Sequence, residues 1–111
     1  MFLVCSLSVS PSNKPLLSNK PNPLPQDLRE AHGIFYPDKR RPVTSLSAAF
    51  PSFDFTHMTA EEDVLWAPEK RESLSEVNRR ITRVFEWLEN RPERNVAVVT
   101  HGVWMEECLR R

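Results

Sequence analysis

Glycine is scarce in this chain: only Gly33 and Gly102 occur among its 111 residues. A loop that cradles phosphate with backbone amides needs several closely spaced glycines, so a loop of that kind is excluded. Cysteine is equally scarce, and Cys5 and Cys108 lie far apart in the sequence, without the spacing of metal ligands. We therefore expect two free thiols in a reducing compartment, which favours a cytoplasmic location.

Neither sign of charge is in excess: 15 basic residues balance 15 acidic residues. This balance argues against a nucleic-acid partner, and residues 39–41, the densest basic run, are typical of a solvated loop. The chain also lacks any apolar run near the roughly 18 residues of a membrane span. Residues 1–9 are apolar but carry no positive charge, which makes them a poor signal peptide. We expect no membrane partner.

The chain divides into three parts. Residues 1–9 could form one strand, whereas residues 10–26 carry no acidic residue and hold five prolines, at positions 11, 15, 21, 23 and 25. Proline removes backbone donors and blocks helices and central strands, so residues 10–26 are predicted to be a linker or a disordered arm. Residues 27–111 are expected to form one small domain.

The clearest predicted element is a helix over residues 73–90. Ser73 and Glu76 have the spacing of a capping box, and Arg91-Pro92 ends the helix. Apolar residues at spacings of three and four predict one buried stripe, formed by Leu74, Val77, Ile81, Val84, Phe85 and Leu88. The outer face is expected to carry Arg79, Arg80, Arg83, Glu86 and Glu89.

Residues 27–68 are predicted to be mostly irregular. Residues 27–30 should be a short extended piece, and residues 43–50 a helix capped by Thr44 or Ser45 and closed by Pro51. The aromatic residues of the loop 52–68 are expected to plug that loop onto the core; they are Phe53, Phe55 and Trp66.

A strand, a turn and a second helix follow over residues 95–109. The four apolar residues 96–99 suit a strand covered on both faces, and Thr100, His101 and Gly102 follow it directly. In open α/β sheets, ligands bind at the carboxyl ends of strands, where helix N-termini offer free amides to anions. His101 either caps this turn or belongs to a site. The order helix, strand, helix predicts an α/β fold with a small, mostly parallel sheet.

Three groups could carry chemistry: His101, Glu30 and the pair Arg71-Glu72. A histidine with a carboxyl group is typical of general acid–base catalysis, or of phosphoryl chemistry in which an acid protonates the leaving group. The alternatives are a surface carboxylate for Glu30 and simple helix-start residues for the pair.

The order of several motifs resembles a known family. Val98-Val99-Thr100-His101-Gly102, preceded by Arg71-Glu72-Ser73-Leu74 and a long amphipathic helix, resembles the C-terminal part of the histidine phosphatase superfamily, the phosphoglycerate-mutase-like proteins. Leu28-Arg29-Glu30 with Gly33 is similar to the segment that bears this family's proton donor. The resemblance covers about residues 28–111 and implies a truncated three-layer sandwich, its sheet flanked by helices.

The resemblance also implies a reaction. A nucleophilic histidine takes the phosphoryl group of a small phosphomonoester, and water then removes it. On this chain Glu30 matches the proton donor and His101 the phosphate-binding histidine. Glu72, Ser73 and Gly102 match positions beside the substrate. The implied partner is a small phosphorylated molecule or inorganic phosphate.

Two departures from the family pattern affect activity. The nucleophile's Arg-His-Gly motif is absent, and the nearest match, Ala31-His32-Gly33, lacks the arginine and the preceding buried strand. Lys14 follows Ser10-Pro11, where the family has a phosphate-binding arginine; it is therefore a candidate substrate-binding residue, although a lysine cannot replace a bidentate guanidinium. We therefore expect a truncated or pseudogene-like relative, or an incomplete gene model, without turnover.

Two functions stay open for this sequence. One is an enzyme lineage whose activity needs a longer form, and the other is a non-catalytic domain that binds an anion or a protein through the surviving half-site. A metal site from His32, His57 and His101 has no recognisable spacing, so we expect no metal and no cofactor.

Overall fold

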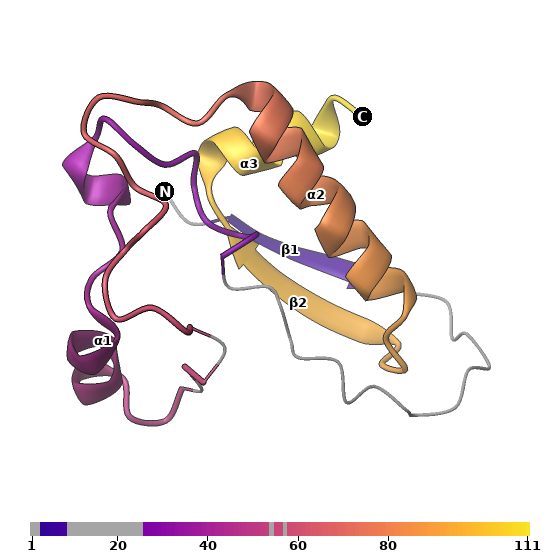
Figure 1. Cartoon of the computed structure of the whole chain (residues 1–111). Coiled ribbons are helices and arrows are strands. Elements are labelled where there is room, and N and C mark those ends of the chain that lie inside the picture. Colours follow the sequence, from indigo (N-terminus) through magenta and orange to yellow (C-terminus); the bar gives the residue numbers. More distant parts are fainter. Residues whose placement is uncertain (1–2, 9–25, 54, 57) are drawn as a thin grey trace.

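A computed structural model describes residues 3–8, 26–53, 55–56 and 58–111. Lys14, His57 and residues 10–25 of the expected arm lie outside the described residues. Helices and strands both occur, as the α/β prediction requires (Figure 1). In chain order the elements are β1 (Leu3–Ser8), the 3-10 helix η1 (Tyr36–Asp38), α1 (Val43–Ala49), α2 (Leu74–Glu89), β2 (Asn95–Thr100) and α3 (Gly102–Leu109).

The two described strands pair antiparallel, with Leu3 opposite Thr100 and Ser8 opposite Asn95. The prediction of a mostly parallel sheet is therefore wrong for this pair of strands. A helix before a strand predicts a parallel neighbour only if the helix itself follows a strand of the same sheet. Between β1 and α2, the described residues form helices and loops and contain no such strand.

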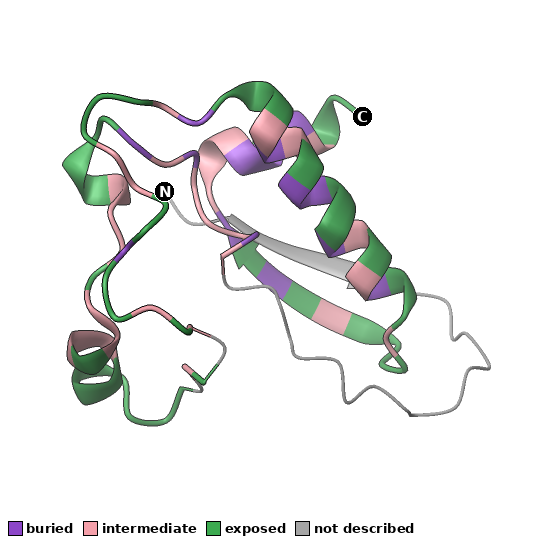
Figure 2. Cartoon of the chain, in the orientation of Figure 1, coloured by how far each residue is buried: buried purple, intermediate pink, exposed green. Residues whose placement is uncertain are grey.

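Strand β2 is buried on one face only. Val98 and Thr100 are 4% and 0% exposed, whereas Val99 between them is 54% exposed. Helix α2 crosses the buried face, where Val98 packs with Val84 and Trp104 in one core (Figures 1 and 2). The expectation of a strand covered on both faces is wrong, because apolar residues alternate between a packed and an open face here. Among the described elements, α2 and α3 share this one core, and no third layer covers Val99.

Helix α2 follows its sequence closely. Ser73 is the N-cap, its hydroxyl accepts from the amide of Glu76, and the Glu76 carboxylate accepts from the amide of Ser73, so the predicted capping box is confirmed. Four residues of the predicted stripe are buried: Val77, Ile81, Val84 and Leu88.

Two residues of α2 differ from expectation. Leu74, in the first turn, is 51% exposed because it lies at the end of the helix, outside the core cluster. Arg80 is only 5% exposed, although its charge had assigned it to the outer face. Its position, three residues after Val77 and four before Val84, places it on the buried face of the helix.

The segment from η1 to residue 66 lies to one side of the sheet and α2 (Figure 1). Helix α1 forms as predicted, but Pro42 is its N-cap and neither Thr44 nor Ser45 caps it. Glu61 instead accepts two hydrogen bonds from the start of this helix. Its backbone carbonyl accepts from the amide of Val43, and its carboxylate accepts from the amide of Thr44. The prediction that the aromatic residues of loop 52–68 pack onto the core is also wrong for Phe53, which is 68% exposed and packs edge-on against Phe50. No described helix combines the length and apolar character needed to cross a bilayer.

Candidate functional site

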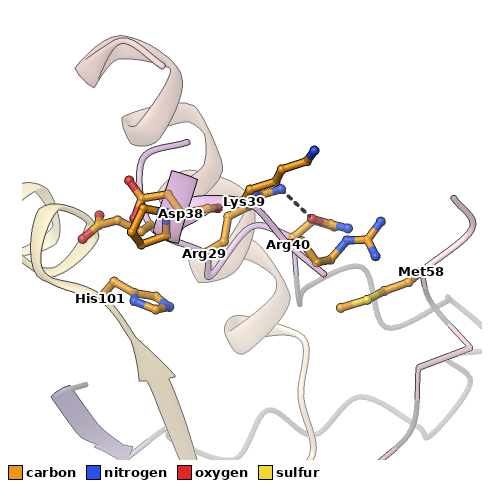
Figure 3. A pocket seen from close by; sticks show the side chains of 9 residues that line it. Arg29, Asp38, Lys39, Arg40, Met58 and His101 are labelled. Carbon is orange, nitrogen blue, oxygen red and sulfur yellow. Dashed lines mark hydrogen bonds between the residues drawn. The ribbon is translucent and has the colours of Figure 1, made fainter. Parts of the chain in front are cut away.

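An open hollow of about 310 Å³ lies beside the end of β2 (Figure 3). Its wall comes from four parts of the chain: residues 26, 29 and 30; residues 37–40; Met58; and His101. Glu30 and His101, which the sequence singled out, therefore open onto one space. Four charged residues join them there: Arg29, Asp38, Lys39 and Arg40.

His101 stands at the junction of β2 and α3. It is the N-cap residue of α3, with an extended backbone (φ −123°, ψ 172°), and its side chain makes no capping hydrogen bond. The capping role that the sequence left open is thus not the role of this imidazole. The ring is half-buried and faces the hollow (Figure 3).

The Glu30 carboxylate lies at the N-terminus of α3. One oxygen accepts from the amide of Ala31 at 2.9 Å, and the other accepts from the amide of Val103 at 3.2 Å. The first amides of a helix have no partner within the helix and favour negative charge, so α3 provides a site for this carboxylate. A Cβ atom on Gly102 would lie 3.8 Å from the same carboxylate, which is ordinary contact.

Residues 26–29 form a turn, not the expected extended piece, and three buried donors hold the turn that carries Glu30. The Thr100 hydroxyl donates to the carbonyl of Leu28 at 2.7 Å, and the Trp104 indole donates to the carbonyl of Asp27 at 2.8 Å. The third donor is the guanidinium of Arg80. Buried carbonyls need such partners, so β2, α3 and α2 each fix the turn.

Glu72 is buried away from the hollow, in a pair with Arg80. Its carboxylate accepts two hydrogen bonds from the guanidinium, each 2.7 Å long. The imidazole of His32 lies 3.6 Å from the same carboxylate and does not line the hollow. Burial lowers the pKa of His32, and the Glu72 charge opposes that shift only in part.

The other predicted site residues are placed as follows. The Ser73 hydroxyl donates to the Glu76 carboxylate within the capping box, and Ser73 does not line the hollow. Substrate contacts of Ser73, Glu72 and Gly102 stay predictions. Among the described residues no group of three or more metal-ligating side chains comes together.

The cations beside the hollow are held by the loops. Arg29 donates to both oxygens of Asp63, at 2.9 and 2.5 Å. Arg40 donates to the carbonyls of Ala60 and Glu62, and the ammonium of Lys39 lies 5.2 Å from the centre of the Trp66 ring. These loop contacts account for much of the basic run 39–41.

Sequence reasoning missed the residues that support the site. Arg80 had a usable signal, because it shares the helical spacing of the buried stripe. Thr100 and Trp104 had none, since their partners are carbonyls more than 70 residues away in the sequence.

Comparisons with known proteins show which family the chain belongs to. Residues 27–111 match the family model of the histidine phosphatase superfamily (branch 1). Three relatives from Arabidopsis thaliana are similar to the chain. The "Phosphoglycerate mutase-like protein" is 39% identical over 101 residues, covering 88% of this chain and 37% of the relative. "Phosphoglycerate mutase-like protein 1" is 36% identical over 84 residues, covering 76% of this chain and 30% of the relative.

"Phosphoglycerate mutase-like protein 2" is 36% identical over 77 residues, or 69% of this chain and 22% of the relative. The chain thus spans well under half the length of these relatives. No solved structure matches it. Since the family model covers most of the chain, including both Glu30 and His101, the protein belongs to the histidine phosphatase superfamily.

Proposed function

We propose that this chain binds the phosphate group of a small phosphomonoester, or inorganic phosphate, in the hollow between His101 and Glu30. We further propose that the 111-residue chain carries out no phosphoryl transfer. The observation that carries the proposal is the presence of both side chains on the wall of one hollow.

His101 has the role of a phosphate ligand in this proposal. The imidazole places a donor on the wall of the hollow, next to the helix N-terminus whose Val103 amide holds Glu30. Arg29, Lys39 and Arg40 add positive charge on the opposite wall (Figure 3). The Asp63 carboxylate compensates much of the charge of Arg29, and loop carbonyls engage Arg40, so Lys39 and Arg40 supply most of this charge and His101 carries the direct contact.

Glu30 has the position of the acid, a role that would be used only in a form of the protein that also carries the nucleophile. A carboxylic acid beside a bound phosphate can donate a proton to a departing alkoxide. Its two amide donors hold the side chain at the start of α3, on the wall of the hollow that His101 also lines.

The group that would attack phosphorus is missing. The chain contains no Arg-His-Gly triplet, and His32, in the nearest match, faces Glu72 outside the hollow. In a covalent mechanism the remaining groups act as a unit with the nucleophile, so without it most of the rate is lost. Binding without turnover is the consequence.

A protein-binding role is the alternative. It is favoured by large apolar side chains exposed on the loops beside the hollow: Phe35 at 58%, Tyr36 at 72% and Val64 at 76%. Substituting Tyr36 and Val64 with serine would abolish binding of a protein partner but leave phosphate binding intact.

Two assays test the proposal. Calorimetric titration with inorganic phosphate should show saturable binding that His101→Ala removes and that Glu106→Gln, on the exposed side of α3, leaves unchanged. An aryl phosphate should not be hydrolysed. Absence of phosphate binding, or robust hydrolysis that His101→Ala abolishes, would overturn the proposal.

A further inference from the structure

We propose that Arg80 and Glu72 are a positioning pair, which holds the backbone on both sides of Glu30 so that its carboxyl stays at the start of α3. The consequence for phosphate binding rests on the proposed function above. The positioning itself rests on the contacts of the two side chains.

Arg80 fixes the backbone before Glu30. From the middle of α2 its guanidinium donates to the carbonyl of Asp27 at 2.7 Å and to that of Arg29 at 3.0 Å. A longer contact, 3.5 Å, reaches the carbonyl of Glu30 itself. One planar group thereby gathers three carbonyls of one turn, which a lysine ammonium cannot reproduce together with a bidentate carboxylate contact.

Glu72 fixes the backbone after Glu30. Its amide donates to the carbonyl of His32 at 2.8 Å, and its carboxylate lies 3.4 Å from the amide of His32. The same carboxylate holds the plane of the Arg80 guanidinium through two bonds. Glu30 is therefore bracketed, with Arg80 on one side and Glu72 on the other.

The pair is too deeply buried to act as an ordinary surface salt bridge. The side chains of Arg80 and Glu72 are 6% and 3% exposed. A buried ion pair is weak evidence for stability, because desolvation offsets much of its attraction, but it fixes geometry when its hydrogen bonds are complete. Here the bonds not used within the pair go to the segment that bears Glu30.

The test measures hydrogen exchange at the two backbone amides that donate to the Glu30 carboxylate. Amide hydrogen exchange of Ala31 and Val103 is measured by NMR in the wild type and in Arg80→Lys, with the Ile81 amide in α2 as an internal reference. Arg83→Lys is the matched control, since Arg83 lies on the same helix and, among the described residues, directs its hydrogen bonds to the side chain of Asp27.

We expect Arg80→Lys to accelerate exchange at Ala31 and Val103 about tenfold relative to Ile81 and to weaken phosphate binding about tenfold. Arg83→Lys should do neither. Equal acceleration at all three amides, or none, would overturn the positioning role. If Arg80→Lys does not fold, the same exchange and phosphate-binding measurements are made on Glu72→Gln and judged by the same criteria.

The two proposals fail separately. If the wild type does not bind phosphate, the proposed function fails, while selective exchange at Ala31 and Val103 still supports the positioning pair. If the wild type binds phosphate and Arg80→Lys binds it equally, with unchanged exchange, the positioning pair alone fails.

Discussion

The carboxylate of Glu30 accepts a hydrogen bond of 3.2 Å from the backbone amide of Val103. This bond joins a turn near the start of the matched domain to the first turn of α3, two residues beyond His101. Because the turn and the helix are tied together here, the acid and the imidazole face the same hollow. The account of the site depends on this relationship.

Replacing Gly33 with alanine should destabilise the fold. Gly33 has a φ of +90°, and a Cβ atom there would lie only 1.8 Å from the carbonyl oxygen of Lys70. The loops around residues 33 and 70 would have to separate, which breaks the hydrogen bond from Ile34 to Ala67. We expect a loss of about 3 kcal/mol or more in the free energy of unfolding, measured by denaturant titration.

Gly102→Ala is the matched control for that experiment. The nearest atom to a Cβ at this position is a Glu30 oxygen at 3.8 Å, and the backbone is that of an ordinary helix. The change in unfolding free energy should stay within about 1 kcal/mol. A cost for Gly102→Ala equal to that for Gly33→Ala would refute the explanation from steric contact.

Acid should weaken the fold partly through Asp63. Burial opposes its ionisation, but hydrogen bonds from the Arg29 side chain and the Arg40 amide outweigh that effect, so the pKa of Asp63 lies well below its usual range. The unfolded chain then takes up this proton first, near pH 4, and stability is lost as pH falls further. Asp63→Asn should cost about 3 kcal/mol at pH 7 and flatten the loss of stability below pH 4.

Chemical denaturation at a series of pH values checks this expectation. The stability difference between the wild type and Asp63→Asn should shrink as pH falls from 4 to 2. A constant difference across that range would contradict the assigned pKa direction.

His32 should give a second pH dependence, at higher pH. Burial lowers the pKa of His32, and Glu72 counteracts this only partly. The unfolded chain therefore binds this proton more readily than the folded chain, and stability should fall as pH drops through about 6.5. His32→Gln should remove this part of the slope in melts between pH 7.5 and 5.5. An identical slope in the variant would show that His32 is not its source.

The start and the middle of the α2 stripe should respond differently to truncation. Ile81 is 0% exposed, and Ile81→Ala should cost about 2–5 kcal/mol. Leu74 is 51% exposed, and Leu74→Ala should change the unfolding free energy by about 0.5 kcal/mol or less. If thermal melts show equal losses of stability for the two variants, the Leu74 side chain contributes to the core as much as Ile81 does.

Local signals in the sequence predicted local structure well. The capping box at Ser73, the apolar spacing of α2 and the valine run of β2 each depend on neighbouring residues, and each element forms within about one residue of its predicted range. The position of His101 at the end of a strand follows from the same kind of signal.

Contacts between residues far apart in the sequence could not be predicted from those local signals. The burial of Arg80 depends on carbonyls some 50 residues earlier, and the antiparallel pairing of β1 with β2 joins segments about 90 residues apart. The open face bearing Val99 was missed because a run of valines has the same appearance whether one face or both are packed. Glu30 was a candidate from its residue type, its role came from the family resemblance, and only the structure shows which amides hold its carboxylate.

Site-resolved NMR during a titration with inorganic phosphate tests the central claim most directly. The account predicts saturable chemical-shift changes of the His101 imidazole and the Val103 amide with one common dissociation constant. In His101→Ala, the Val103 amide signal should no longer shift on addition of phosphate. The amide of Leu109, an exposed residue at the far end of α3, should not shift. If the His101 and Val103 signals stay unchanged, or shift no more than that of Leu109, phosphate does not bind between His101 and Glu30.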